Sequence, residues 1–277
     1  MRDASPLRYP GGKWRLAGCF ERIIALNFSR QPIYIEPYAG GASLALSLLF
    51  AGAVAEIHLN DLDPAIHAFW LSVLRHEDNL CALIESVRIS PAEWRRQRII
   101  YGAGSTSKTV ELGFATFFLN RTNHSGILNG GMIGGKDQNG SWKLDARFNR
   151  SELVSRIQRI ASFKDRIHLR RQDAVAFLNT QKLSQNTLVY LDPPYYKAGW
   201  RLYFNAYKPG DHAAVRDRAV SLNCPWIVSY DDVPEIRELY ASYKSRRVRL
   251  LHTARSARVG KEVIFFSNRL QLPRPLR

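Results

Sequence analysis

The sequence predicts an α/β protein with a doubly wound sheet. Short apolar runs of strand length alternate along the chain with stretches of helical periodicity. Several of these runs end at an acidic residue, and open α/β sheets bind ligands at the carboxyl ends of their strands. With 277 residues, of which 45% are hydrophobic, the chain is long enough for one large domain that carries a smaller insertion.

Four of the predicted strands lead into carboxylates. The run PIYI ends at Glu36, EIHL leads into Asp61, and TLVYL ends at Asp192, while a further strand runs into Asp173. We therefore expect these four side chains to share one site. The expected strands cover residues 32–35, 56–59, 166–171, 187–191, 226–229 and 263–266, and the expected helices cover residues 42–50, 64–75, 151–161 and 212–222.

One segment interrupts the alternation of strands and helices. Residues 70–150 are rich in Arg, Asn and Gly and contain a loop-like stretch at residues 130–140. We expect an inserted subdomain over residues 70–150, and a main domain formed by residues 1–69 and 151–277.

The net charge indicates a polyanionic partner. The 40 Lys and Arg residues exceed the 24 Asp and Glu residues by 16, which is typical of proteins that bind nucleic acid or an anionic membrane surface. The longest uncharged stretch, residues 38–55, is interrupted by Gly and Ser and is interpreted as a buried helix. The first residues lack the apolar core of a signal peptide. We expect a cytoplasmic protein with no membrane partner.

No metal site is predicted from the cysteines. Cys19, Cys81 and Cys224 are far apart and form no pair with the spacing of a zinc motif. Each is expected to be a small buried residue.

The string DPPY, Asp192 to Tyr195, follows an apolar strand. Two prolines form a rigid turn that fixes the preceding carboxylate and the following ring. The carboxylate and a proline carbonyl can accept hydrogen bonds from one exocyclic amino group, and the Tyr ring can stack on a planar base. A bare Pro-Pro turn is more often only a stiff loop, but the strand and the flanking residues favour a base-binding site.

Two further motifs lie at strand ends. Gly40 and Gly41 follow EPYA at a strand-to-helix turn, which is typical of either a ligand loop or a tight structural turn. Asp61 lies about 20 residues later, where doubly wound folds bind a ribose. Asp63, next to Pro64, is expected to cap the following helix. Near the N-terminus, the string RYPGGK lacks the spacing of a phosphate loop.

In this order, RYPGGK, EPYAGGAS, the Asp61 strand end and DPPY resemble the DNA adenine methylase family of N6-adenine DNA methyltransferases. Residues 117–126 resemble the start of its target-recognition segment and residues 261–263 its C-terminal signature, so that the resemblance spans residues 7–268. It implies a Rossmann-like α/β sheet of the kind found in methyltransferases dependent on S-adenosylmethionine (SAM). It also implies an inserted, mainly helical target-recognition subdomain.

The resemblance implies a SAM site and a site for a flipped adenine of double-stranded DNA. The residues that it assigns to SAM are Tyr9, Lys13, Glu36, Pro37, Gly40, Gly41, Asp61, Asp173 and Asp192, with Asp61 on the ribose and Asp173 near the adenine ring. The residues that it assigns to the target base and catalysis are Asp192, Pro193, Pro194 and Tyr195. Hydrogen bonds from N6 to Asp192 and to the Pro193 carbonyl would make the nitrogen more nucleophilic, and this chemistry needs no metal.

DNA contacts are expected in the insert. The candidates are Asn120, Arg121, His124, Ser125 and Asn129, with phosphate contacts from about half of Arg95, Arg96, Arg98, Arg147 and Arg150. Members that read GATC carry an arginine near the position of Asn129 and an aromatic residue near that of His124, so GATC recognition is not predicted. The basic residues from Lys244 to Lys261 suit either a DNA-backbone track or a charged sheet edge.

Three other functions stay open at this point. They are methylation of RNA, methylation of cytosine N4, and a catalytically inactive DNA-binding partner with the same fold. The sequence also leaves open the oligomeric state and whether a cognate restriction endonuclease accompanies the chain.

Overall fold

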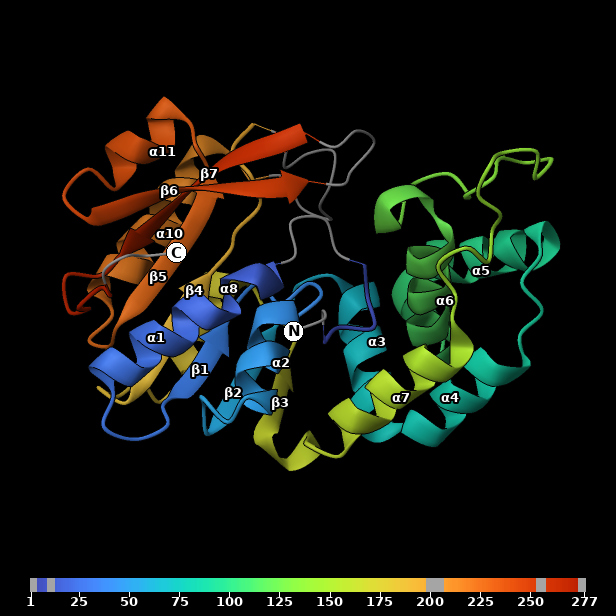
Figure 1. Cartoon of the computed structure of the whole chain (residues 1–277), viewed down its shortest axis with the longest axis horizontal. Coiled ribbons are helices and arrows are strands. Elements are labelled where there is room, and N and C mark those ends of the chain that lie inside the picture. Colours follow the sequence, from blue (N-terminus) through green and yellow to red (C-terminus); the bar gives the residue numbers. More distant parts are fainter. Residues whose placement is uncertain (1–3, 9–12, 198–206, 253–257, 274–277) are drawn as a thin grey trace.

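The computed structural model describes residues 4–8, 13–197, 207–252 and 258–273, and within them the fold is a seven-stranded sheet covered by helices (Figure 1). The strand order is β3-β2-β1-β4-β5-β7-β6. The strands are β1 (Ile33–Glu36), β2 (Glu56–Asn60), β3 (Ile167–Arg170), β4 (Thr187–Leu191), β5 (Trp226–Asp231), β6 (Lys244–His252) and β7 (Arg258–Phe266).

The sheet confirms the doubly wound prediction. Strands β1 to β5 pair in parallel, whereas β7 is antiparallel to both β5 and β6. The chain leaves β1 toward β2 and β3 and then returns to β4 on the other side of β1, which creates a topological switch point between β1 and β4. All six predicted strands are present.

Strand β6 is the strand that the sequence did not predict. It is the edge strand next to β7 and carries Lys244, Arg246 and Arg247, which are exposed. Charged side chains on an edge strand discourage pairing with another sheet. This position fits the charged-edge alternative for the basic C-terminal stretch.

The predicted helices form nearly as expected. Asp63 caps α3 by accepting a hydrogen bond from the Ala65 amide at 2.8 Å, and Pro64 occupies the first turn. The helices are α1 (Ala17–Asn27), α2 (Ser43–Phe50), α3 (Pro64–Arg75), α4 (Glu77–Ser86), α5 (Pro91–Ala103), α6 (Thr109–Thr122), α7 (Arg150–Ala161), α8 (Ala174–Thr180), α10 (Pro209–Ser221) and α11 (Pro234–Leu239). Short 3₁₀ helices are η1 (Lys13–Leu16), η2 (Gly104–Thr106), η3 (His124–Gly126) and η4 (Lys164–Arg166).

The segment between β2 and β3 is mainly helical. Helices α4, α5 and α6 lie beside the sheet, and α3 and α7 run between them and it (Figure 1). The expected boundary after residue 69 falls inside α3, whose Trp70 indole donates to the Gly40 carbonyl at 2.8 Å. Helix α3 therefore packs against the main domain as well as against the insert.

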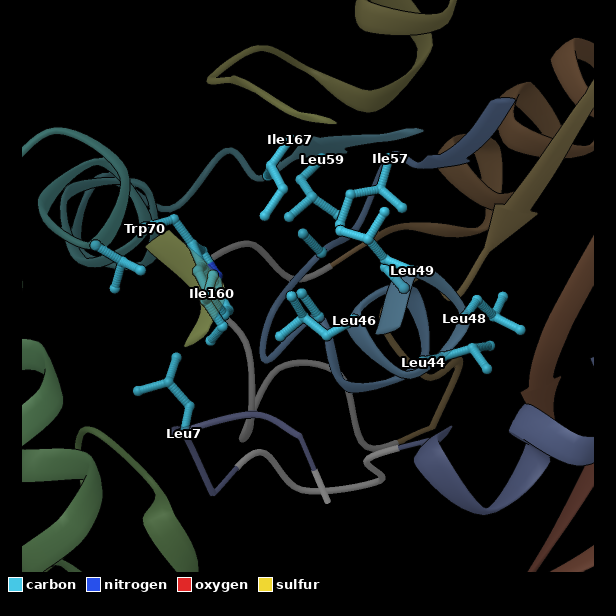
Figure 2. Close-up of a cluster of buried hydrophobic side chains, with 14 of the residues drawn as sticks. Leu7, Leu44, Leu46, Leu48, Leu49, Ile57, Leu59, Trp70, Ile160 and Ile167 are labelled. Carbon is cyan, nitrogen blue, oxygen red and sulfur yellow. The ribbon is translucent and has the colours of Figure 1, made fainter. Parts of the chain in front are cut away.

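One hydrophobic core joins these two parts. Figure 2 shows Leu46 and Leu49 of α2 near Ile57 of β2, with Trp70 of α3 and Ile160 of α7 in the same cluster. Helix α2 is buried along nearly its whole length, as expected for the apolar stretch at residues 38–55. No helix in the described part of the chain has the length and apolarity to cross a membrane.

Because α3 and α6 are in close contact, we expect alanine substitutions at two glycines to have opposite effects on stability. A Cβ on Gly113 of α6 would lie 2.4 Å from Ser72 Oγ and 2.7 Å from the Ala68 carbonyl oxygen, whereas a Cβ on Gly102 of α5 would meet nothing within 4 Å. We expect Gly113→Ala to lower the free energy of unfolding by about 1–3 kcal/mol, because the helices must separate. Gly102→Ala should raise it by about 0.5–1 kcal/mol. Urea denaturation of both variants measures this, and equal stabilities would contradict the contact.

Candidate active site at the carboxyl ends of the strands

The strand ends bring the predicted carboxylates to one edge of the sheet. Central strand β1 ends at Glu36, with β2 and β4 as its neighbours. Asp61 follows β2 and Asp192 follows β4, so both carboxylates flank the switch point. In the DPPY turn, Pro193 and Pro194 are buried, whereas Asp192 and Tyr195 are partly exposed. The prolines thus form the rigid base, and the carboxylate and the ring face outward.

Asp192 is fixed by two donors. Its Oδ2 accepts from Lys13 Nζ at 2.8 Å, and its Oδ1 accepts from Ser229 Oγ at 2.6 Å. Ser229 lies in β5 beside β4, and its hydroxyl is 2.7 Å from the Tyr190 hydroxyl. Lys13 is only 4% exposed and Asp192 is 24% exposed. The carboxylate is therefore oriented by buried groups while it still reaches the surface.

Glu262 of β7 completes this network. One of its carboxylate oxygens is 3.5 Å from Lys13 Nζ, and the other accepts from the Tyr195 hydroxyl at 2.5 Å. The Lys13 ammonium also lies 5.7 Å from the centre of the Tyr195 ring. Lys13, Asp192, Tyr195 and Glu262 therefore join the N-terminal motif, the DPPY turn and the last strand.

Glu36 lies buried beneath this network. It is 4% exposed and accepts a hydrogen bond from the Tyr34 hydroxyl at 2.9 Å. Burial raises the pKa of Glu36 to about 8, and the charge of Asp192 adds to this shift, whereas the Tyr34 hydrogen bond and Lys13 oppose it. A large part of the Glu36 population is therefore protonated at neutral pH.

Asp61 and Gly40 are hydrogen-bonded to each other. The Gly40 amide donates to Asp61 Oδ2 at 2.8 Å, and the Asp63 amide donates to Oδ1 at 3.0 Å. Burial, followed by the charge of Asp63, raises the pKa of Asp61 to about 7. Gly40 has a φ of +46°, which suits glycine, and the Asn60 side chain donates to the Pro37 carbonyl at 3.0 Å. The glycine turn is thus a fixed wall of the site.

Asp173, which was predicted to lie near the adenine ring of SAM, caps a helix in the structure. It caps α8 by accepting from the Val175 and Ala176 amides at 2.9 and 3.0 Å. Nearby, the hydroxyls of Tyr38 and Tyr207 are 3.0 Å apart. Burial raises the pKa of Tyr207, and the charges of Asp173 and Asp61 contribute to that shift. These aromatic and acidic groups therefore share one part of the site.

Three other residues were predicted to belong to the site. Pro37 and Gly41 are buried in the same turn as Gly40. Tyr9 lies outside the described residues.

Asn120 is a case where the structure differs from the prediction. The side chain is 1% exposed, and its amide donates to the carbonyls of Arg8 at 3.0 Å and Gly126 at 2.9 Å. Its carbonyl oxygen accepts from the Arg8 amide at 2.7 Å. Because these polar atoms are engaged inside the protein, Asn120 fastens the N-terminal segment to α6 and does not present its amide to DNA.

Arg121 lies in a cluster of positive charge. Its Nε donates to the Arg147 carbonyl at 2.7 Å. Burial, followed by the charges of Arg8 and Arg156, lowers the pKa of Arg121 to about 9. Arg156 pairs with Glu152 at 2.6 Å. An anion bound here would relieve the repulsion among these arginines.

The loop after α6 exposes the other predicted DNA contacts. His124 and Asn129 are exposed, and Ser125 is partly exposed with a φ of +57°. Arg98 supports the loop by donating to the Leu128 carbonyl at 2.6 Å. Arg150, in contrast, donates to the carbonyls at the end of α4, those of Ile84, Glu85 and Val87, so among the five candidate arginines it is one with a structural contact.

The sequence did not identify two residues as members of the site. Ser229 lies inside β5, whose neighbour in the sheet, β4, is followed by Asp192, so the order of the strands was the missing information. Glu262 lies in the KEV string that resembles the C-terminal signature, but its partners Lys13 and Tyr195 are distant in sequence.

The buried Glu36 predicts a pH effect on stability. In the unfolded chain this carboxyl has its ordinary pKa near 4.3. Between that value and about 8 the native state holds a proton that the unfolded state has lost, so stability falls as the pH rises. We expect Glu36→Gln to remove a slope of up to about 1.4 kcal/mol per pH unit from this window.

The measurement is the free energy of unfolding at pH 5.5 and 7.5, by denaturant titration. Glu235→Gln, at an exposed position, is the matched control and should keep the wild-type difference between the two pH values. If Glu36→Gln keeps it as well, the native pKa of Glu36 is not raised.

The chain matches the family model of D12 class N6 adenine-specific DNA methyltransferases over residues 9–253. No curated protein sequence matches it. Among solved structures, it is similar to an rRNA methyltransferase from Streptomyces viridochromogenes, at 18% identity and a TM-score of 0.44, with 93% of this chain and 85% of that chain covered. It is also similar to a putative RNA methyltransferase from Pyrococcus horikoshii, at 10% identity and a TM-score of 0.45, with 94% and 84% covered.

The family match includes the strand ends, the DPPY turn and the helical insert, and it extends over most of the chain. The chain therefore belongs to the D12 class of N6 adenine-specific DNA methyltransferases.

Proposed function

We propose that Asp192 and the Pro193 carbonyl bind the N6 amino group of the target adenine in the SAM-dependent DNA methylation that the D12 class performs. The observation that carries this proposal is the pair of hydrogen bonds from Lys13 and Ser229, at 2.8 and 2.6 Å, which orient a partly exposed carboxylate. Each carboxylate oxygen can accept more than one hydrogen bond, so Asp192 can still accept from an amino group.

The adenine amine needs this assistance because its lone pair is delocalised into the ring. Two acceptors, Asp192 and the Pro193 carbonyl, favour a nitrogen whose lone pair is directed out of the ring plane. As N6 gains the methyl group it acquires positive charge, which the Asp192 carboxylate stabilises until one N6 proton is lost to solvent. A preoriented carboxylate does this without reorganisation during the reaction.

Tyr195 is proposed to stack on the flipped base. A base inside a duplex must leave the stack to reach such a site, and an aromatic ring compensates for part of the lost stacking. The hydrogen bond from the Tyr195 hydroxyl to Glu262, at 2.5 Å, restricts the ring, and the buried Pro193 and Pro194 hold the turn below it. A restricted ring loses little entropy when the base binds.

The other side of the strand ends suits SAM, which supplies an electrophilic methyl group on a positively charged sulfur. Glu36 is buried and Asp61 is partly exposed, and desolvation raises the pKa of both carboxyls. A bound cation would favour their ionised forms. Asp61 is proposed to bind the ribose hydroxyls. Glu36, Pro37, Gly40 and Gly41 would line the methionine half, with Tyr9, Lys13 and Asp192 bordering the site and Asp173 near the adenine ring.

The insert, expected over residues 70–150, is proposed to bind duplex DNA. His124, Ser125 and Asn129 form an exposed loop after α6, where side chains can reach a groove. The arginine cluster of Arg8, Arg121, Arg147 and Arg156 is suited to backbone phosphates, because phosphate would neutralise its mutual repulsion. Residues 1–69 and 151–277 would then form the catalytic domain.

We expect Asp192→Ala to reduce methyl transfer to duplex DNA by at least about a hundredfold, because it removes the acceptor for N6. Transfer of tritium from labelled SAM measures the rate, and far-UV circular dichroism of the variant tests whether the fold is intact. Asp232→Ala, a carboxylate that pairs with Arg237 and Arg247 outside the network, is the control. Undiminished transfer by Asp192→Ala would refute the mechanism.

The same assay separates the other candidate functions. Duplex DNA, RNA and DNA whose target strand lacks adenine are compared as substrates, and the methylated base is identified after hydrolysis. Label in N6-methyladenine of duplex DNA supports the proposal. Label in RNA or in N4-methylcytosine, or no transfer with any substrate, contradicts it.

We expect Arg121→Gln to weaken binding to duplex DNA at every sequence tested and to lower the slope of log affinity against log salt by about 1. Arg30→Gln is the matched control, since Arg30 is exposed before β1, at the opposite end of the strands from the site. Fluorescence anisotropy at several salt concentrations measures the slope. An unchanged slope in Arg121→Gln would remove this residue from the phosphate contacts.

A further inference from the structure

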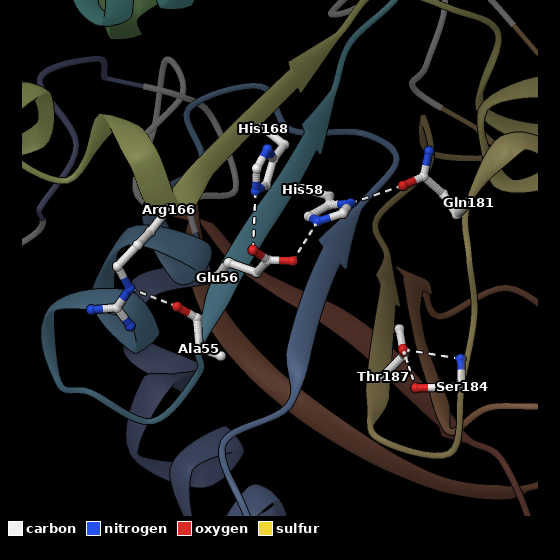
Figure 3. Close-up of polar contacts among 8 residues, drawn as sticks. All are labelled: Ala55, Glu56, His58, Arg166, His168, Gln181, Ser184 and Thr187. Carbon is white, nitrogen blue, oxygen red and sulfur yellow. Dashed lines mark hydrogen bonds and ion pairs between the residues drawn. The ribbon is translucent and has the colours of Figure 1, made fainter.

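Two histidines and a glutamate lie together on one face of the sheet, toward the amino end of β2 and away from the candidate active site. Glu56 and His58 are two residues apart in β2, and therefore share one face, and His168 pairs with His58 across the β2–β3 ladder (Figure 3). Ile57, between Glu56 and His58, and its partner Ile167, just before His168, are buried in the core on the opposite face. Well-packed strands thus hold the three polar side chains in place.

The geometry brings three ligand-type atoms together. His58 Nε2 is 3.1 Å from Glu56 Oε1, and His168 Nε2 is 3.1 Å from Glu56 Oε2. One ligand atom from each residue lies within 4.8 Å of the other two. Around a tetrahedral Zn²⁺ with bonds of 2.0–2.1 Å, ligand atoms are roughly 3.3 Å apart. Small side-chain rotations would therefore bring all three atoms into a coordination sphere.

The contact with Gln181 orients the His58 ring. Its Nδ1 is 2.8 Å from the side-chain oxygen of Gln181, and its Nε2 faces a carboxylate oxygen, so both ring nitrogens meet acceptors. The Gln181 amide is oriented by its nitrogen, which donates to the Phe177 carbonyl at 3.4 Å. In the tautomer in which Nδ1–H donates to Gln181, the Nε2 atom presents its lone pair toward Glu56, which is the form of the ring that can bind a metal ion.

We propose that Glu56, His58 and His168 form a binding site for a divalent transition-metal ion, with Zn²⁺ the best fit. Two imidazole nitrogens and one carboxylate are a ligand set typical of Zn²⁺, and Gln181 occupies the outer position that fixes the His58 tautomer with Nε2 as the ligand atom. The exposed fractions of Glu56, His58 and His168 are 32%, 22% and 44%, so an ion can enter from solvent and water can complete its coordination.

The site is structural and separate from methyl transfer. Glu56 begins β2 and Asn60 ends it, and at about 3.3 Å per residue the cluster starts roughly 13 Å from the carboxyl end of the strand. Strand β3 is the edge of the sheet. An ion shared by His58 and His168 would clamp this edge to β2, whose other end leads into Asp61. The inference does not depend on the proposed roles of Asp192 or Arg121.

The test is calorimetric titration of the untagged, metal-stripped full chain with ZnCl₂ at pH 7.5, with MgCl₂ as a second probe. We expect one Zn²⁺ per chain and no comparable binding of Mg²⁺, which prefers oxygen ligands. The double variant His58→Gln/His168→Gln keeps side chains that can hydrogen-bond to Glu56 but removes both imidazoles. It should lose the Zn²⁺ isotherm, whereas the control His76→Gln, at an exposed histidine outside the cluster, should keep it.

A further variant tests the outer contact. Gln181→Ala leaves the three ligands in place and should weaken Zn²⁺ binding by about tenfold. Zn²⁺ should also raise the melting temperature of the wild type and not that of the double variant, because the ion binds the folded state. Circular dichroism without metal verifies that the variants fold. Absence of Zn²⁺ binding to the wild type, unchanged affinity in the double variant, or equal affinity for Mg²⁺ would each overturn the proposal.

Discussion

The active site depends on one buried charge, the ammonium group of Lys13. A charged group removed from water needs partners of opposite charge, and Lys13 has two of them in Asp192 and Glu262. These partners belong to the turn after β4 and to β7, while Lys13 itself lies in η1. The pairing therefore requires three distant segments to meet at one point. Glu262 also accepts a hydrogen bond from the Tyr195 hydroxyl, so the carboxylate and the aromatic ring of the DPPY turn are both held in a network that contains the same cation.

The carboxylates of the site fall into two electrostatic classes. Asp192 accepts hydrogen bonds from a cation and a hydroxyl, whereas burial raises the pKa values of Glu36 and Asp61 to about 8 and about 7. At neutral pH the site therefore carries less negative charge than its number of carboxyl groups suggests. A cationic ligand would favour the ionised form of both acids, so its binding would release protons to solvent. The chain thus carries an excess of 16 positive charges, while the charge of the strand-end site would change when a cationic ligand binds.

Much of the fold could be predicted from local patterns, because buried parallel strands are apolar and end in polar turns. The same patterns predicted the approach of Glu36, Asp61 and Asp192. Strand β6 was missed because an edge strand is half exposed and its charged residues conceal the alternation. Asn120 was wrongly predicted to face DNA because the sequence does not tell whether an amide at the end of a helix turns outward or binds another segment. Ser229 required the order of the strands, which no local pattern contains.

The contact between α6 and the N-terminal segment limits how independently the helical insert and the strand-end site can be changed. Asn120 binds both backbone polar groups of Arg8, and a Cβ on Gly126 would lie 2.1 Å from the Arg8 carbonyl oxygen, so the chain passes against the recognition loop with no space between them. Five residues later the same chain supplies Lys13 to Asp192. Any replacement of the end of α6 and the loop after it would therefore have to keep an amide and a glycine at these two positions, or the segment that leads to Lys13 would lose its anchor.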